Sequence, residues 1–295
     1  MASGINKKKY QKPNFLIVGA AKSGTTSLAM YLNQHPDIFI PKQKELRFFV
    51  KDTLLKISDD NPLKEHILKT SILEEQEYFN TYNVKEKRAG DASIHYLYHY
   101  DEAIPKIKHF IGDVPIIIIL RDPIQRLVSN YKFNKYHHNN TIQKELELEE
   151  YRINNQFNSF WFYQKLGMYH KQVKAYLDNF SKVEIIIFED FINMTENIVT
   201  GLVENLGLEP IKIDYTTKHN ISKEKNYFHR ILEATKIKKL VPKSLKKNRL
   251  IKNLLHKKIE HHTHEKVLNN LYSNFKSDIA KLESLISRDL SIWKK

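Results

Sequence analysis

A glycine-containing turn with one lysine inside it is the part of this sequence best suited to bind a phosphate. Residues 15–26 read Phe-Leu-Ile-Val-Gly-Ala-Ala-Lys-Ser-Gly-Thr-Thr, an apolar run followed by a turn in which Gly19 and Gly24 are five residues apart. Glycine lets the backbone turn tightly, and the amides at the start of a helix favour an anion. We therefore expect the backbone of Gly24, Thr25 and Thr26 to hold a phosphate.

The position of the lysine distinguishes this turn from the loop that binds ATP. In the pattern G-x-x-x-x-G-K-[ST] the lysine follows the second glycine and reaches the β and γ phosphates. Here Thr25 occupies that position and Lys22 lies inside the turn. This argues against a small-molecule or nucleoside kinase, which is kept as an alternative. The turn better suits a single 5′-phosphate that carries another transferable group.

A second candidate anion pocket follows the strongest strand pattern, residues 116–120. Arg121 leaves this strand at its carboxyl end, where open α/β sheets bind ligands. Ser129 lies eight residues further on, about two helical turns, so one phosphate can contact both if the helix runs alongside it. The alternatives are a salt bridge for Arg121 and a structural hydroxyl for Ser129.

A carboxylate among cations and aromatic residues is the candidate for proton transfer. The segment 41–49 contains Lys44, Glu45 and Arg47, followed by two phenylalanines. Flanking cations would keep Glu45 ionised and so able to accept a proton, and aromatic walls would exclude water. The alternative is an ion-pair cluster on the surface.

Short β-branched runs alternate with longer periodic segments, which is typical of a parallel sheet flanked by helices. The predicted strands are 15–18, 88–92, 116–120 and 183–188. The predicted helices are 25–34, 101–110, one opened by Asp122-Pro123, and 192–206 closed by Gly207; an acidic helical run at 143–150 is interpreted as a solvated face. We expect an α/β fold with a P-loop-like parallel β-sheet.

The net charge of +14 is concentrated near the C-terminus. Residues 218–295 contain 20 Lys and Arg against 7 Asp and Glu, which leaves 28 against 27 for residues 1–217. We expect a basic tail at 1–12, one α/β domain at 13–225, and a helical lysine-rich extension at 226–295 packed on it. The extension is either a solvated helical face or a surface for a polyanion or membrane, so a basic nucleic-acid-binding module on a degenerate nucleotide fold is a further alternative.

Several classes of site are not expected. The sequence has no cysteine, and the histidines at 137–138 and 261–264 lack partners at ligand spacing, so no metal site is predicted. The longest aliphatic run, 114–120, is too short for a transmembrane segment, and the N-terminus lacks the apolar core of a signal peptide. These features predict a cytoplasmic protein and do not indicate an oligomeric state.

Taken together, the motifs resemble the sulfotransferases that use 3′-phosphoadenosine 5′-phosphosulfate (PAPS). The loop Lys22-Ser23-Gly24-Thr25-Thr26 is similar to the 5′-phosphosulfate loop of that family, and Arg121 with Ser129 matches its 3′-phosphate motif. Lys44-Glu45-Leu46-Arg47-Phe48-Phe49 resembles the Lys-Glu-x-His-Phe-Phe element of the heparan-sulfate glucosaminyl N- and 3-O-sulfotransferases and their bacterial relatives. Weaker similarities lie at 90–93, at 96–97 and at 167–169, and the resemblance covers about 13–225.

The resemblance implies in-line sulfuryl transfer to a hydroxyl or amine of a carbohydrate or glycolipid, including an anionic one, with adenosine 3′,5′-bisphosphate (PAP) as the product. Lys22 would stabilise the leaving phosphate oxygen, and Glu45 would take the acceptor proton. The remaining implied contacts are Ser23, Gly24, Thr25 and Thr26 for the 5′-phosphate, Arg121 and Ser129 for the 3′-phosphate, and Lys44, Arg47 and Ser93 for the acceptor. The chain departs from the family pattern at Arg47, where a histidine is usual, and at 218–223, which lacks glycine.

Overall fold

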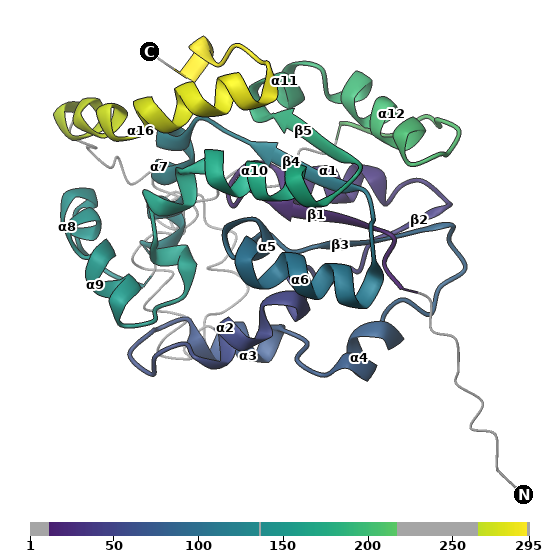
Figure 1. Ribbon diagram of the computed structural model, residues 1–295, viewed down its shortest axis with the longest axis horizontal. Helices are drawn as coiled ribbons and strands as arrows, with labels where there is room; N and C mark the ends of the chain where they lie inside the picture. Colours follow the sequence, from purple (N-terminus) through teal and green to yellow (C-terminus); the bar gives the residue numbers. More distant parts are fainter. Residues whose placement is uncertain (1–11, 136, 217–264, 294–295) are drawn as a thin grey trace, which may run out of the picture.

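Five strands and their connecting helices form a layered α/β structure (Figure 1). The computed structural model describes residues 12–135, 137–216 and 265–293. The strands are β1 (Phe15–Gly19), β2 (Ile38–Phe39), β3 (Arg88–Ala92), β4 (Ile116–Leu120) and β5 (Val183–Ile187). The α-helices are α1 (Thr25–Leu32), α2 (Lys51–Leu55), α3 (Lys64–Thr70), α4 (Glu75–Asn80), α5 (His95–Tyr98), α6 (Tyr100–Ile111), α7 (Pro123–Asn134), α8 (Ile142–Glu147), α9 (Glu149–Asn154), α10 (Tyr169–Asn179), α11 (Phe188–Asn193), α12 (Thr195–Asn205) and α16 (Glu265–Ile286).

All strand pairs are parallel, in the order β2-β3-β1-β4-β5. From β1 the chain builds β2 and β3 on one side, then crosses to β4 and β5 on the other. Such a reversal is a topological switch point, and ligands of open α/β sheets bind outside the carboxyl ends of strands there. The loops that follow β1, β3 and β4 therefore lie next to one another. The predicted α/β fold with a parallel sheet is confirmed.

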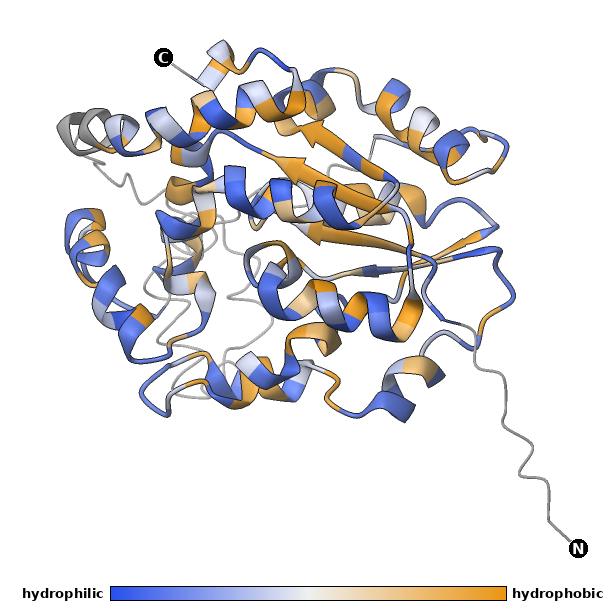
Figure 2. Ribbon diagram, in the orientation of Figure 1, coloured by the Kyte–Doolittle hydropathy of each residue, from blue (hydrophilic) through white to orange (hydrophobic). Residues whose placement is uncertain are grey.

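Alternate residues of β1 face two different hydrophobic layers, as the period of a strand requires. Leu16 and Val18 pack in the layer that includes α6, α10 and α16, whereas Phe15 and Ile17 pack against α1 and α12. Figure 2 shows the central strands as the most hydrophobic elements. Burial on both faces explains why these strands read as continuous apolar runs in the sequence.

The predicted elements are correct in type and wrong at some boundaries. The two-residue strand β2 was not predicted, because two residues cannot show an alternating pattern. The predicted helix 192–206 is wrong at its start, since α11 ends at Asn193 and α12 begins at Thr195. Asp122 caps α7 as expected: its Oδ1 accepts from the amides of Ile124 (2.8 Å) and Gln125 (3.2 Å), with Pro123 in the first turn.

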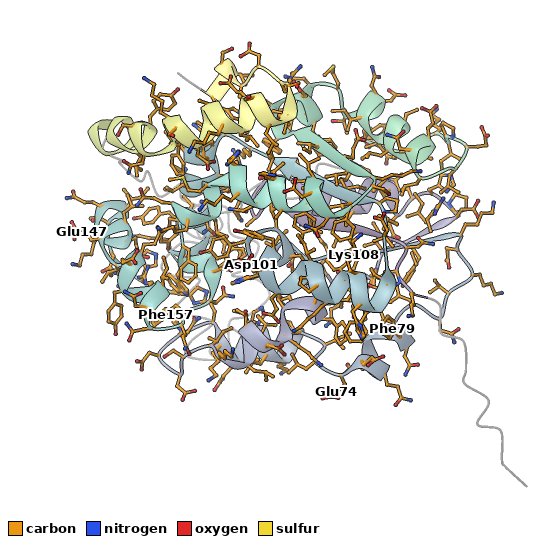
Figure 3. The ribbon with its side chains drawn as sticks, in the orientation of Figure 1. Glu74, Phe79, Asp101, Lys108, Glu147 and Phe157 are labelled. Atoms are coloured by element: carbon orange, nitrogen blue, oxygen red, sulfur yellow. The ribbon has the colours of Figure 1, made fainter. Side chains whose placement is uncertain are left out.

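The acidic run at 143–150 is helical, but the prediction that it forms a solvated face is wrong. Glu145 and Glu149 are buried, while Glu147 points outward (Figure 3). The carboxylate of Glu145 accepts from both terminal nitrogens of Arg152, at 2.7 and 2.8 Å, because a buried charge needs a partner. A charge count along the sequence does not reveal which acid turns inward.

The C-terminal helix α16 packs against α10 and α7. Trp293 is buried and donates its indole N–H to Glu189 Oε2 at 3.0 Å, and Asp278 accepts from the amide of His170 at 3.1 Å. These contacts support an extension packed on the α/β domain. The boundary at 225, the loop 218–223 and most of the basic region lie outside the described residues, so those predictions stand as predictions. Among the residues described, no helix combines the length and apolar character needed to cross a membrane.

Candidate active site

The turn after β1 presents uncapped backbone amides at the start of α1. Gly24 precedes the helix with φ of 90°, and no side chain of the described residues caps this end. The first amides of a helix lack intrahelical partners, and the helix dipole adds positive potential there. This terminus is therefore suited to an anion, as the sequence predicted.

Replacing Gly24 with alanine should destabilise the protein by about 1–2 kcal/mol, the usual cost of a left-handed conformation for a residue with a Cβ. The added Cβ would also lie 3.0 Å from the ring of Phe188. Gly201→Ala is the matched control, because Gly201 is in α12 and its Cβ would meet no atom within 4 Å. We expect denaturant unfolding to show a loss for Gly24→Ala and a gain of about 0.5–1 kcal/mol for Gly201→Ala. Equal effects of the two changes would contradict this reading of the turn.

Arg121 faces the turn rather than a neighbouring acidic helix. Its Nη1 donates to the carbonyl of Lys22 at 3.1 Å, and its guanidinium lies 4.7 Å from the ring centre of Phe188. The ammonium of Lys22 lies 4.3 Å from the ring centre of Phe133 on α7. Burial, together with the smaller effects of the charges of Arg121 and Arg126, lowers the pKa of Lys22 to about 8. Lys22 and Arg121 thus meet at the turn, and Arg126 lies close enough to affect the charge of Lys22.

Ser129 is placed by α7 on the side of the helix that faces Lys22. It is half-buried, and Phe133, over whose ring Lys22 lies, is four residues further along the helix. Residues four apart share a helix face. The structure therefore brings Arg121, Lys22 and the Ser129 face of α7 together, while a phosphate contact of Ser129 stays a prediction.

The remaining loop residues differ in exposure. The side chains of Ser23 and Thr25 are buried, whereas Thr26 is half-buried and its hydroxyl accepts from Lys44 Nζ at 3.1 Å. Burial of the first two hydroxyls favours phosphate contacts through their backbone amides. The contact of Lys44 with Thr26 joins the segment 41–49 to the turn after β1.

Glu45 lies beside this junction and is held by the residues that follow β3. Its backbone amide donates to the carbonyl of Ala92 at 3.3 Å, and its Oε2 accepts from the amide of Ile94 at 3.1 Å. The side chain is 19% exposed. Burial alone would raise the pKa of Glu45, but hydrogen bonding to His95 and the charges of Arg47 and Lys44 outweigh it, so the pKa is lowered. The carboxylate is therefore ionised at neutral pH.

The two phenylalanines after Arg47 are core residues and anchor this segment. Phe48 stacks on Tyr78 with ring centres 4.4 Å apart, and Phe49 is fully buried. The cluster extends to Phe79 of α4, which lies below α6 in Figure 3, and to Phe110. The two phenylalanines were expected to form the aromatic walls of a pocket. They instead pack in the core and hold the segment that carries Glu45 in place.

Arg47 and Ser93 are engaged inside the protein. The amide of Arg47 donates to Ser93 Oγ at 3.1 Å, and Ser93 donates to Asp91 Oδ1 at 2.7 Å. Arg47 Nη1 donates to the carbonyl of Glu45 at 2.8 Å. Asp91 is buried, which raises its pKa to about 6 against the opposing effect of its hydrogen bonds. These contacts favour a supporting role for both residues, and acceptor contacts by them stay a prediction.

Sequence reasoning missed two buried residues: His95, which lies next to Glu45, and Asn158, which contacts His95. His95 follows the similarity at 90–93, just after β3. If the sequence had shown that β3 pairs with β1, a position of His95 near β1 could have been inferred. Asn158 lies far from Glu45 along the chain, and no motif near it indicates a role in the site. No group of three residues suited to hold a metal ion occurs in the part of the chain that the structure describes.

Comparison with known proteins agrees with this geometry. A family model described as "Sulfotransferase family" matches residues 13–212. The bifunctional heparan sulfate N-deacetylase/N-sulfotransferase 3 of Mus musculus is 25% identical over 245 residues, which are 77% of this chain and 26% of that protein. The membrane-associated sulfotransferase kil1 of Dictyostelium discoideum is 30% identical over 122 residues, which are 41% of this chain and 23% of that protein. This chain thus spans about a quarter of the length of these two relatives.

A solved structure shares most of the fold. The crystal structure of a sulfotransferase from Alicyclobacillus acidocaldarius superposes with a TM-score of 0.75 at 29% sequence identity, covering 97% of this chain and 100% of that one. The family match includes the turn after β1, Glu45 and Arg121. On this evidence the chain belongs to the sulfotransferase family.

Proposed function

We propose that this sulfotransferase moves a sulfuryl group from PAPS to a hydroxyl or amine of a carbohydrate or glycolipid, with Glu45 as the base. The observation that carries the proposal is the contact between Lys44 Nζ and Thr26 Oγ1. It joins the segment that carries Glu45 to the turn after β1, which supports the proposal. A base on a segment that contacts a phosphate site suits transfer from a bound donor to an acceptor beside it.

The residues at the turn fit a donor with phosphates on both sides of an adenosine. The uncapped amides at the start of α1 suit a 5′-phosphate, and the guanidinium of Arg121 with the Ser129 face of α7 suits a 3′-phosphate. The lowered pKa of Lys22 reflects burial and neighbouring positive charge that a bound anion would compensate. When bound, PAPS supplies the sulfuryl group.

The chain's own residues then supply orientation and charge. Glu45 takes the acceptor proton as the bond from the acceptor atom to sulfur forms. Lys22 stabilises the negative charge that grows on the phosphate oxygen as its bond to sulfur breaks. Groups fixed in advance around developing charge contribute most of the rate in transfers of this kind.

The acceptor class rests on two supports. The segment 44–49 resembles the corresponding element of the heparan-sulfate enzymes, and the mouse relative carries heparan sulfate in its name. Lys44 also adds positive charge next to the base, which favours an anionic sugar. Contact of the basic C-terminal region, residues 218–295, with a polyanion or membrane is a separate proposal.

Replacing Arg121 with alanine should weaken binding of PAP about 10- to 100-fold, the usual cost of losing hydrogen bonds to a charged group. Binding of AMP, which lacks the 3′-phosphate, should change little. Isothermal titration calorimetry with both nucleotides measures the difference. An equal loss for PAP and AMP would show that Arg121 does not recognise the 3′-phosphate.

Incubation with sulfur-labelled PAPS and separate extracts of polysaccharide, lipid and small metabolites tests the acceptor class. We expect label in the polysaccharide or glycolipid fraction, with one PAP released for each sulfate transferred. Label confined to small metabolites would overturn the carbohydrate assignment. Thermal stabilisation by ATP or an oligonucleotide, and not by PAP, would overturn the donor assignment and favour the kinase or the nucleic-acid-binding module.

A further inference from the structure

His95 is a buried imidazole beside the candidate base, contributed by a different element from the base itself. It opens α5, directly after β3, and its Nδ1 lies 3.5 Å from Glu45 Oε2. Residue 47, where the resembling element carries a histidine, is Arg47 in this chain. The imidazole next to Glu45 thus reaches it from α5 instead of from the segment that carries the base.

Asn158 determines which nitrogen of His95 carries the proton. The side-chain Oδ1 of Asn158 accepts from the amide of Phe160 at 2.9 Å, so its Nδ2 faces His95 Nε2 at 3.3 Å. An amide NH₂ only donates, so Nε2 must accept and the proton of the neutral ring is on Nδ1. Burial lowers the pKa of His95 against the opposing effect of Glu45, which keeps the ring neutral.

The orientation of Asn158 is itself fixed by α7. The carbonyl of Phe160 accepts from Asn130 Nδ2 at 2.8 Å and from Asn134 Nδ2 at 2.7 Å. These bonds hold the turn that contains the Phe160 amide. Rotating the Asn158 amide would place its NH₂ against that N–H and leave a buried donor without an acceptor, which costs free energy.

Arg47 directs its Nε–H at the other ring nitrogen, Nδ1, and so requires that nitrogen to be an acceptor. Its Nε lies 3.4 Å from His95 Nδ1 and 4.0 Å from Glu45 Oε2. A neutral ring cannot accept at both nitrogens, and Asn158 is the donor held in place at Nε2. With the proton on Nδ1, the 3.4 Å contact from Arg47 Nε, longer than the 3.3 Å contact from Asn158, is given up, and Nδ1–H of His95 donates to Glu45 Oε2. The 3.5 Å separation is long, as catalytic hydrogen bonds often are before substrate binds.

The two oxygens of Glu45 consequently differ. Oε2 accepts hydrogen bonds from the amide of Ile94 and from Nδ1–H of His95. Oε1 has no hydrogen-bond partner among the described residues. We propose that His95, oriented by Asn158, is the positioning residue of the base: it holds Oε2 and leaves Oε1 to take the acceptor proton. This inference rests on the proposed role of Glu45.

The first test reads the tautomer directly and needs no acceptor. In protein labelled with ¹⁵N-histidine, imidazole nitrogen–proton correlation spectra distinguish a ring protonated on Nδ1 from one protonated on Nε2, and the His95 signal is identified by its absence in His95→Asn. We expect the Nδ1-protonated form. The Nε2-protonated form, the commoner one in water, would overturn the inference.

The second test compares two amide replacements of His95. In His95→Asn the side-chain NH₂ takes the position of Nδ1 and still donates to Glu45, whereas in His95→Gln it takes the position of Nε2. We expect His95→Gln to lower kcat about tenfold, the usual worth of one hydrogen bond to a charged group, and His95→Asn to stay closer to wild type. The acceptor in these assays is the compound that takes up label in the incubation with sulfur-labelled PAPS.

A pH profile separates positioning from a general structural defect. Loss of the donor to Oε2 raises the pKa of Glu45, so the acidic limb of kcat/KM should move to higher pH in His95→Gln and not in His95→Asn. PAP affinity should be unchanged in both. The charged and titratable groups that face Glu45 and remain in both variants are Lys44, Arg47 and Asp91.

His99→Gln is the control, because His99 ends the same short helix and does not contact Glu45. Identical pH profiles for His95→Gln and wild type would overturn the inference. If His95→Gln does not fold, a folded His95→Asn with strongly reduced kcat would overturn it as well. A Glu45→Gln variant of full activity would instead remove the base itself, so failure of the proposed function is recognised separately.

Discussion

Glu45→Gln should lower kcat about 10²- to 10⁴-fold, the range by which a placed proton acceptor accelerates a reaction. The amide has the same shape as the carboxylate but cannot take the acceptor proton. The lowered pKa of Glu45 means that the wild-type side chain is ready to act at neutral pH, and the variant removes this capacity at every pH. Steady-state kinetics with the labelled acceptor measures the loss.

Binding of the donor product separates a chemical defect from a folding defect. Glu45 is not among the groups proposed to contact either phosphate, so PAP affinity should be unchanged in Glu45→Gln. Glu150→Gln, an exposed change on α9, controls for the substitution itself. A Glu45→Gln enzyme with wild-type kcat would show that another group takes the proton.

Lys22→Met should lower kcat about 10²- to 10³-fold, comparable to the loss of one preorganised group that stabilises developing negative charge. Methionine is of similar length but has no charge to place over the ring of Phe133. The phosphate oxygen would then leave without a cation beside it. A change confined to KM, with kcat unaffected, would contradict the proposal that Lys22 stabilises the leaving phosphate oxygen.

The pH dependence gives an independent view of the same lysine. Since the pKa of Lys22 is lowered to about 8, its charged form is lost as pH rises through that value in the free enzyme. We expect kcat/KM for PAPS, which reports the free enzyme, to fall above pH about 8. Lys22→Arg should remove this fall in kcat/KM at high pH, because a guanidinium stays protonated. If the fall in kcat/KM at high pH persists in Lys22→Arg, it must be due to the titration of another group.

The arrangement of the turn after β1 and of Arg121 was predictable because its signals are local. A glycine turn after an apolar strand, a lysine inside the turn and an arginine after the next strong strand can each be read within a few residues. Parallel strands then bring their carboxyl ends to one edge of the sheet. The structure places Arg121 against Lys22 accordingly.

The surroundings of Glu45 were not predictable, because they depend on contacts between distant segments. His95 and Asn158 are 50 and more than 100 residues from Glu45 in the chain, and neither belongs to a motif. The sequence also did not show that Phe48 and Phe49 face the core, or that Glu145 and Glu149 turn inward to bind the segment before α10. Buried polar pairs are specified by packing, which a single sequence does not display.

A crystal structure of the complex with adenosine 3′,5′-bisphosphate tests the central claim most directly. The account predicts the 5′-phosphate on the amides of Gly24, Thr25 and Thr26, and the 3′-phosphate on the Arg121 guanidinium and the Ser129 hydroxyl. Lys22 should reach the 5′-phosphate on the side that faces Glu45. A nucleotide bound elsewhere, or one whose 3′-phosphate points away from Arg121, would contradict it.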